Sequence, residues 1–369
     1  MNKELISDIQ GICLIILFIS GSTLALPTGI AAGRDLWLAI LLALVLAIPL
    51  YLIYSRLLSL YHGKDIFGIL EAVFGKFFGK AVGLIFVVYA FHLGTLVLRD
   101  QGDYLVAISL PETPIIIPTI IVVILCTLVV KAGIEVLGRW SKLFVILNAP
   151  IPTIMILMLI PQMDICNIMP ILYKGTKPFL KGTLQALSFP FGDVVVFLMV
   201  FFALKSKKSS YNVFIKGLLW GGFLIIGVSL AEILVLGEDL YAATYFPNHS
   251  AASKVSIGDL LQRLEVIVIV ATLTSFFVKI SICLLAVCNG ISKILGCREY
   301  RFIVAPIALL MCNFSYFIHD NIIMKTKWVD SIGIYYFLPL QVGIPILILI
   351  AAEIKQRRIK NNTRRVNRK

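Results

Sequence analysis

Two oppositely charged side chains stand inside long apolar segments of the sequence. Asp193 is the only charged residue between Lys181 and Lys205, and Lys279 interrupts the apolar run SFFVKISICL. A charged side chain at the centre of a bilayer costs roughly 2.5–3.5 kcal/mol, so such residues usually serve a function. We expect Asp193 to meet a ligand amine, a proton or a lysine. We expect Lys279 to lie near the first apolar segment, with snorkelling of its ammonium to the cytoplasmic surface as the alternative.

Small polar residues, or proline and glycine, interrupt two of the apolar segments. The first contains FISGSTLALP at 18–27, and the second contains SFPFGD at 188–193. Irregular backbone cannot face lipid and must line a cavity. Free amides at helix N-termini attract a carboxylate, and loose carbonyls attract an ammonium. The pair of interruptions therefore predicts a mid-membrane site for a small ligand such as an amino acid, formed by Ser20, Gly21, Ser22, Thr23, Ser188, Phe189, Gly192 and Asp193.

Glycine and proline also have simpler uses in membrane helices. We expect Gly21 to let the backbone unwind and Pro190 and Gly192 to open a turn. Alternatively, Gly21 only permits tight helix packing and Pro190 makes a simple kink. The similar position of the two interruptions, five apolar segments apart, favours the binding site.

Three further side chains are candidates because of their place in neighbouring apolar segments. Tyr89 and Thr272 are expected to border the predicted site from two other segments. His92 is a candidate proton sensor and is counted with Asp193 and Lys279 as a coupling group. A lone histidine is, however, more often a packing residue with its hydrogen bonds satisfied.

The composition requires membrane-spanning elements to position these residues. Of the 369 residues, 59% are hydrophobic and 14% are charged, against about 25% charged in a soluble domain. We predict an all-α membrane protein with ten spans of about 20 residues, near 9–32, 36–58, 81–108, 115–133, 137–160, 179–204, 211–237, 261–289, 301–318 and 333–353. The interruptions then fall in spans one and six, which predicts a five-plus-five inverted repeat with two broken helices.

Charge bias along the chain predicts the orientation. If the N-terminus is cytoplasmic, 23 of the 33 Lys and Arg residues fall on the cytoplasmic side. We expect one transmembrane domain over 1–354, with repeats at about 5–160 and 175–353, and a basic cytoplasmic tail over 355–369 beside the lipid headgroups. Both termini are then cytoplasmic. We also expect an amphipathic interfacial helix at 64–80 and a short outer helix at 256–264.

The sequence carries no pattern typical of an enzyme. It has no glycine-rich phosphate loop, no metal-ligand spacing and no CxxC pair among its seven cysteines. We therefore predict no catalytic activity, no cofactor and no metal. The net charge of +13 is concentrated in the C-terminal tail beside the last span, so we expect lipid and not nucleic acid as its partner.

Three stretches of the sequence resemble the spore germination protein permease family, the B subunits of nutrient germinant receptors. They are ISDIQGICLIILFISGSTLALP, SFPFGDVVVFLMVF and FFVKISICL, and the resemblance extends over about residues 5–355. Many members have Glu where this chain has Asp193. The resemblance implies the leucine-transporter-type fold of the amino acid–polyamine–organocation superfamily. In that fold Lys279 would replace the sodium ion that related carriers use.

The resemblance also implies a function. It predicts a membrane subunit in the spore inner membrane that works with A and C subunits, binds a small nutrient, commonly an amino acid, and helps trigger germination. An amino-acid transporter of the same superfamily, proton-coupled or facilitated, is the alternative. A purely structural subunit that binds nothing is a third possibility.

Overall fold

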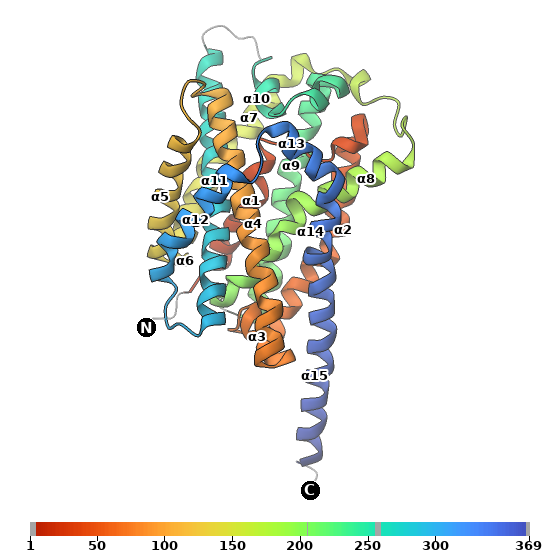
Figure 1. Cartoon of the computed structure of the whole chain (residues 1–369). Helices are drawn as coiled ribbons and strands as arrows, with labels where there is room; N and C mark the ends of the chain where they lie inside the picture. The colour runs from red at the N-terminus through yellow and green to blue at the C-terminus, as the bar shows by residue number, and fades with distance from the viewer. Residues whose placement is uncertain (1–4, 205, 255–259, 367–369) are drawn as a thin grey trace.

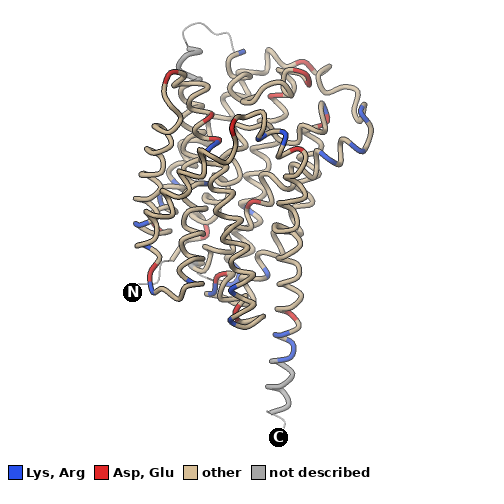
Figure 2. Tube along the Cα trace, viewed as in Figure 1, with Lys and Arg blue, Asp and Glu red and all other residues tan. Residues whose placement is uncertain are grey.

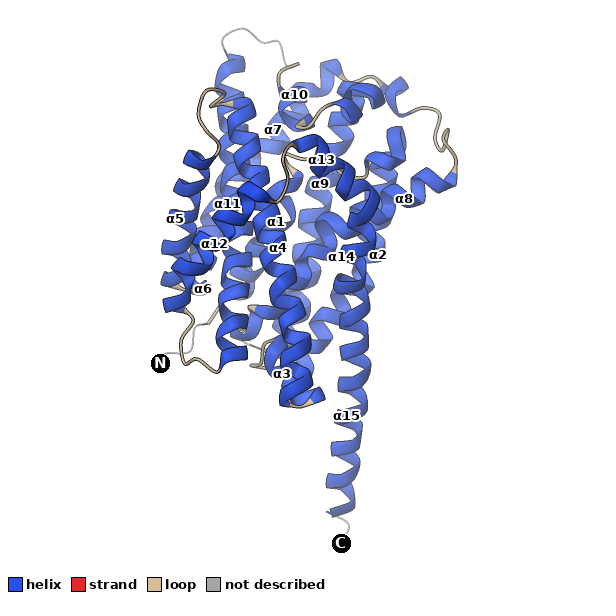
Figure 3. Cartoon of the chain, viewed as in Figure 1, coloured by secondary structure: helices blue, strands red, loops and turns tan. Residues whose placement is uncertain are grey.

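The chain folds into a bundle of helices, most of them long and apolar. The computed structural model describes residues 5–204, 206–254 and 260–366. These residues are almost entirely helical, as Figure 3 shows, and contain no β-structure beyond an isolated bridge between Ile6 and Leu204. Figure 1 shows the helices running roughly side by side, with the two ends of the chain toward the same end of the bundle.

The described residues of the first half of the chain form seven α-helices and three short 3-10 helices. They are α1 (Asp8–Thr23), η1 (Ile30–Asp35), α2 (Leu36–Leu60), α3 (Ile66–Phe74), α4 (Lys76–Ile108), α5 (Ile116–Ala132), α6 (Ile134–Asn148), α7 (Pro150–Leu159), η2 (Ile160–Gln162) and η3 (Ile165–Ile168).

The second half also contains long helices, but more short 3-10 and π turns lie between them. Its elements are α8 (Thr176–Ala186), η4 (Leu187–Phe191), η5 (Gly192–Met199), η6 (Phe201–Ala203), α9 (Lys207–Ala243), α10 (Pro247–Ala252), α11 (Leu260–Leu295), η7 (Arg301–Ile303), α12 (Val304–Phe317), α13 (Ile322–Trp328), η8 (Val329–Gly333), α14 (Ile334–Leu338), η9 (Pro339–Gly343) and α15 (Ile344–Val366).

The helices overlap the ten predicted spans. Among the described residues, seven helical segments are long and apolar enough to cross a membrane, and three shorter apolar helices, Asp8–Thr23, Ile116–Ala132 and Arg301–Phe317, lie at the other predicted positions. Because those three have fewer than 18 residues, the number of crossings stays a prediction. The chain is nonetheless an integral membrane protein by the length and apolarity of its helices.

Of two short helices predicted outside the spans, one has the wrong bounds and the other is untested. The helix expected at 64–80 is broken at Gly75, whose φ of 83° ends α3 and begins α4. Residues 76–80 therefore belong to the third span, and α3 buries Ile66, Phe67, Ile69 and Leu70 against the protein. Most of the helix expected at 256–264 lies outside the described residues, which resume at Leu260 as part of α11.

The core of the bundle surrounds α1. Eleven of its sixteen residues are buried, and it packs against α6, α9 and α11. A helix that is apolar and buried nearly all round belongs in a protein interior. By contrast, α5 exposes a row of apolar side chains, Ile117, Ile120, Ile121, Ile124 and Leu128, on the outside of the bundle, as a lipid-facing helix does.

The last helix projects beyond the bundle. The helix α15 continues through Val366, so most of the predicted basic tail is a helical extension of the last span and not a separate coil. An ion pair of 2.7 Å between Arg56 and Glu353 ties its membrane-proximal part to α2. Figure 2 shows charged residues mostly toward the two ends of the bundle, with few between them.

Candidate functional site

The break in the first span lies just after the residues that the sequence predicts. Ser20, Gly21, Ser22 and Thr23 form the last turn of α1, where the hydroxyls of Ser20 and Thr23 donate to carbonyls four residues earlier in the same helix. The chain leaves the helix over 24–29, where Pro27 lacks an N–H and Gly29 has φ 68°. Only after this segment does η1 begin and lead into α2.

Gly21 has a different role from the expected one. It is helical, and a Cβ there would lie 3.0 Å from Cβ of Lys279 and 3.1 Å from the carbonyl oxygen of Ser275. The prediction that Gly21 unwinds the backbone is therefore wrong. The alternative of tight helix packing holds, because the missing side chain lets α11 approach α1 and lets the Lys279 stem cross it.

The sixth span is broken where the sequence predicts. The helix α8 passes into a wide π-turn, η4, in which Phe189 is extended at φ −130° and ψ 114°, and the chain continues as the 3-10 helix η5. Gly192 is helical, with φ −67°. A Cβ on Gly192 would collide with the side-chain amide of Gln341, so this glycine is needed for close approach of the last span and not for its backbone angles.

An ion pair joins the two breaks. Nζ of Lys279 lies 2.8 Å from Oδ2 of Asp193, and it donates to Oγ of Ser22 at 3.0 Å. The ammonium also lies over the rings of Phe18, at 5.1 Å, and Phe189, at 4.9 Å, which are cation–π distances. Lys279 has no exposed surface, so the alternative that it snorkels to the cytoplasmic face is wrong.

The second oxygen of Asp193 is held by two neutral donors. The Tyr89 hydroxyl donates to Oδ1 of Asp193 at 3.2 Å, and Nε2 of Gln341 lies 3.2 Å from the same oxygen. Nε2 of Gln341 also lies 2.9 Å from the Ser188 carbonyl and 3.0 Å from the Tyr89 hydroxyl oxygen. These side chains with Lys279 and Ser22 form one buried set, which we call the floor network.

Gln341 is the member of the floor network that sequence reasoning missed. It is fully buried in η9. A signal was present: it is the only charged or amide side chain between Asp330 and Glu353, and it stands two residues after Pro339. An amide in an otherwise apolar span needs hydrogen-bond partners inside the protein. The broken sixth span supplies acceptors for the NH₂ group of Gln341, whereas its Oε1 is buried with no hydrogen-bond partner among the described residues.

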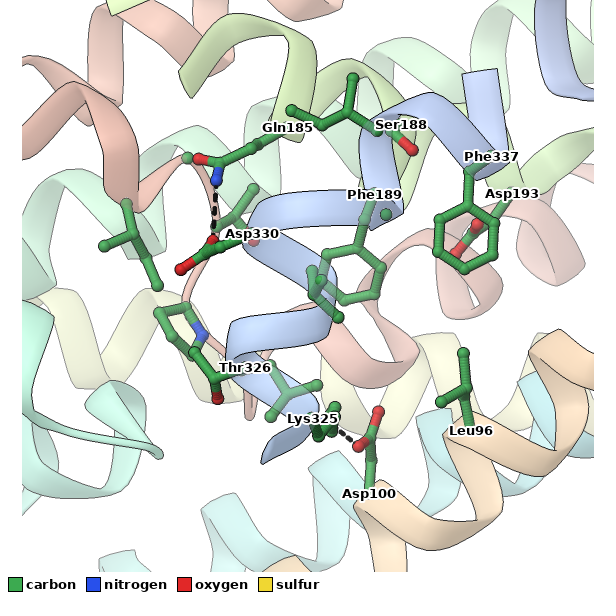
Figure 4. A pocket seen from close by; sticks show the side chains of 18 of the residues that line it. Leu96, Asp100, Gln185, Ser188, Phe189, Asp193, Lys325, Thr326, Asp330 and Phe337 are labelled. Atoms are coloured by element: carbon green, nitrogen blue, oxygen red, sulfur yellow. Dashed lines mark hydrogen bonds and ion pairs between the residues drawn. The ribbon is translucent and has the colours of Figure 1, made fainter. Parts of the chain in front are cut away.

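Above the floor network lies a cavity, which we call the break cavity. Its volume is about 130 Å³, close to the roughly 150 Å³ of an engineered protein cavity that holds benzene, so it suits a small ligand. Most of its wall is apolar. It is lined by Leu26, Pro27, Thr28, Gly29, Ile30, Leu93, Leu96, Val97, Asp100, Gln185, Ser188, Phe189, Asp193, Lys325, Thr326, Val329, Asp330, Gly333, Ile334 and Phe337, many of which Figure 4 draws.

Polar contacts close the side of the break cavity opposite the floor network, and we call them the roof. Lys325 of α13 pairs with Asp100 of α4. Nε2 of Gln185 donates to Oδ1 of Asp330 at 2.9 Å, and the backbone N–H of Ala31 donates to Oε1 of Gln185 at 3.0 Å. Figure 4 shows both side-chain contacts at the edge of the cavity, with Phe189 between them. The roof therefore joins spans one, three and six to the start of the last span.

The predicted site residues separate into two groups. Ser22, Tyr89, Asp193 and Lys279 meet in the floor network, Ser188 contributes its carbonyl, and Phe189 and Gly192 pack beside it. Others lie apart and do not line the break cavity. The Ser20 and Thr23 hydroxyls face their own helix, Thr272 lies beside Tyr104, and the ring of His92 packs among Trp328, Tyr336 and Phe337.

A second, larger cavity opens on the end of the bundle that holds the termini. This terminal-side cavity has a volume of about 1020 Å³ and is lined by charged residues from the 63–76 segment and the 292–301 loop. Asn289 lines it and donates to the carbonyl of Met199, the last residue of η5. Residues 194–199 have no exposed surface, so η5 forms a solid wall between Asp193 and this cavity.

Comparison with known proteins gives the family. The model of the family "Spore germination protein" matches residues 5–323. The chain is 27% identical over 362 residues to spore germination protein KB of Bacillus subtilis, covering 97% of each chain. It is 24% identical over 254 residues to spore germination protein XB of Bacillus anthracis, covering 68% of this chain and 70% of that protein.

Solved structures give the fold. The nucleobase-cation-symport-1 transporter MHP1, in a closed conformation with bromovinylhydantoin bound, superposes with a TM-score of 0.72 at 11% identity, covering 94% of this chain and 78% of that chain. MhsT in complex with L-phenylalanine superposes with a TM-score of 0.65 at 11% identity, covering 95% and 99%. The fold is thus the leucine-transporter type, and the chain belongs to the spore germination protein family.

Proposed function

We propose that the chain is the nutrient-binding membrane subunit of a germinant receptor, and that it binds a small nutrient, an amino acid in the first instance, in the break cavity. The observation that carries the proposal is the position of this cavity, because the irregular segments of spans one and six both line it. Free backbone groups at such breaks recognise small charged ligands in the transporters that share this arrangement.

The proposal separates the predicted site residues into those that line the break cavity and those that lie behind its floor. Ser188, Phe189 and Asp193 line the cavity directly, whereas Ser22, Tyr89, Gly192 and Lys279 shape its floor from behind. Gly21 sets the spacing of α1 and α11. Ser20, Thr23 and Thr272 lose their proposed contact with the ligand, because their side chains are turned elsewhere.

The proposed partners follow from the family. We propose that this chain works as a B subunit beside A and C subunits in the spore inner membrane, with both termini and the projecting end of α15 on the cytoplasmic side. Ligand binding would then pull spans one, three, six and ten together at the roof and pass the signal to the partners. The relatives are germination proteins and the fold neighbours are transporters, so we propose no catalytic step.

Transport is the second candidate, and one observation favours it. The break cavity and the terminal-side cavity lie on opposite sides of η5, as the two access routes of an alternating-access carrier do. A receptor needs only the first cavity to fill. A carrier also needs η5 to move so that the ligand can reach the second.

Two measurements on the full-length chain separate the candidates. In the first, spores lacking the chain are complemented with it, and germination is recorded with single amino acids; the receptor proposal expects germination that depends on the chain. In the second, the chain alone in proteoliposomes is offered the same radiolabelled amino acids. Robust, saturable uptake would overturn the receptor proposal in favour of the carrier, and binding without uptake supports the receptor.

A further inference from the structure

Asp193, which the sequence offers as a partner for a ligand amine, a proton or a lysine, is already occupied. Asp193 accepts from Lys279 on one oxygen and from Tyr89 and Gln341 on the other. A ligand ammonium that bound there would have to displace Lys279 into a site with no solvent, and an unpaired buried ammonium is strongly unfavourable. The floor network therefore presents a neutralised surface to the ligand.

The roof contains a carboxylate that is not neutralised. Asp100 is paired with Lys325, but Asp330 forms no ion pair with any described residue. Asp330 is half-buried in the cavity wall and accepts one hydrogen bond, from Gln185, on Oδ1. The charge of Lys181 acts on Asp330, but the Lys181 side chain is exposed and makes no ion pair with it. Oδ2 of Asp330 is thus available to a donor in the cavity.

The position of Asp330 is set by a neighbouring amide. Because the Ala31 N–H donates to Oε1 of Gln185, the NH₂ group of Gln185 must point toward Asp330. This contact fixes the carboxylate against the first residues of η1 and the last turn of α8. A ligand bound to Asp330 would therefore touch the breaks of spans one and six and the start of the last span at once.

The walls between Asp330 and the floor are apolar. Leu93, Leu96 and Val97 of α4 line the cavity together with Phe189 and Phe337, and Figure 4 shows Leu96, Phe189 and Phe337 around it. We propose that Asp330 is the ammonium-binding residue of this site, and that its ligand is a primary amine with a short apolar body, such as an aliphatic amino acid. The inference rests on the proposed function, because it assumes that the break cavity is the nutrient site.

The test uses the full-length chain in lipid nanodiscs and three probes, L-alanine, L-valine and L-leucine, each beside its 2-hydroxy acid, which replaces the amine with a hydroxyl. Binding is measured to the wild type, to Asp330→Asn and to Asp320→Asn, an exposed aspartate nearby that does not line the cavity. A charge-assisted hydrogen bond predicts that Asp330→Asn weakens amino-acid binding about ten- to hundredfold, while Asp320→Asn leaves it unchanged.

The hydroxy acids are the control for correct folding of Asp330→Asn, because they lack the amine that Asp330 is proposed to bind. In the wild type, loss of the amine should weaken binding by a similar factor, and the hydroxy acids should bind the wild type and Asp330→Asn equally. If the amino acids bind Asp330→Asn as tightly as the wild type, the amine site is elsewhere and the proposed function stands. If none of the three amino acids binds the wild type, both the inference and the amino-acid function fail.

Discussion

The floor and the roof of the break cavity each contain lysine and aspartate side chains, but the two regions differ in how deeply these side chains are buried and in how many partners they have. In the floor, Lys279 and Asp193 are almost fully buried, and each has further hydrogen bonds or aromatic contacts. In the roof, Lys325 and Asp100 keep some exposed surface, and Asp330 has a single amide partner. Both charges of the floor are therefore paired with each other, whereas the Asp330 carboxylate of the roof has no cationic partner among the described residues.

This difference indicates that the two regions have different roles. A buried ion pair with further hydrogen-bond partners fixes the positions of the helices that bear it, because breaking it leaves an uncompensated charge. A partly exposed pair costs less to break, and it can exchange its partner for a ligand or for water. We therefore expect floor variants to act mainly on stability and roof variants mainly on access and recognition.

The largest effect is expected for the floor pair. Lys279→Met should lower the free energy of unfolding by about 3–5 kcal/mol, because the Asp193 carboxylate is left buried and unpaired. Thermal unfolding of the purified chain in nanodiscs measures the loss. The double variant Lys279→Met with Asp193→Asn should recover most of it. Equal stability of Lys279→Met and the wild type would show that the pair does not hold the breaks together.

The next effect is expected at the contact of α1 with α11. Gly21→Leu should cost about 1–3 kcal/mol and abolish the germinant response while the chain still inserts, because its side chain would collide with Lys279 and the Ser275 carbonyl. Gly343→Leu is the matched control, since no atom lies within 4 Å of a Cβ at Gly343. A normal response from spores that carry Gly21→Leu would contradict the assigned packing.

A smaller effect is expected in the roof. Lys325→Met should open the break cavity at least about fivefold more often, because the Lys325 and Asp100 side chains are only 12% and 6% exposed and such a pair is worth more than the roughly 1 kcal/mol of a fully exposed pair. The readout is the rate at which a thiol reagent labels Leu96→Cys, with the exposed Cys166 changed to Ser. Lys327→Met, on the same helix but exposed, is the control. An unchanged rate would mean that the ion pair does not restrain the roof.

The smallest effect is expected at His92. Its ring is stacked on Phe337 at a centroid distance of 6.1 Å and meets the edges of Trp328 and Tyr336. His92→Phe keeps a ring of similar shape and should change stability by less than about 1 kcal/mol. Germination measured between pH 5 and pH 8 should keep its pH dependence in His92→Phe. Loss of that dependence would restore His92 as a proton sensor.

The broken helices were predictable because lipid imposes a strict rule on the backbone. SFPFGD marks the break of span six to within a residue or two, since proline and glycine change local geometry wherever they stand. In FISGSTLALP the helix continues through Thr23, so the break begins about one turn later than predicted. Serine and threonine hydroxyls satisfy carbonyls within a helix, so small polar residues alone do not end it, whereas Pro27 and Gly29 do.

The side chains of the site were only partly predictable. The pairing of Asp193 and Lys279 follows from the cost of isolated charges in a membrane, which forces each to find a partner. The sequence alone cannot show that the partner of Asp193 belongs to the protein itself, so that neither oxygen of this carboxylate is free for a ligand. The positions of Gln341 and Asp330 depend on how the last span packs over the break of span six, and such contacts between residues more than 140 apart carry no local signal.

The central claim is that the break cavity holds the nutrient, and equilibrium binding of a radiolabelled amino acid tests it most directly. The full-length chain in nanodiscs is titrated beside Leu96→Trp, in which the indole fills the cavity, and Leu128→Trp, where the same change faces outward on α5. We predict saturable binding by the wild type and Leu128→Trp, and none by Leu96→Trp. Unchanged binding by Leu96→Trp would place the ligand elsewhere and contradict the account.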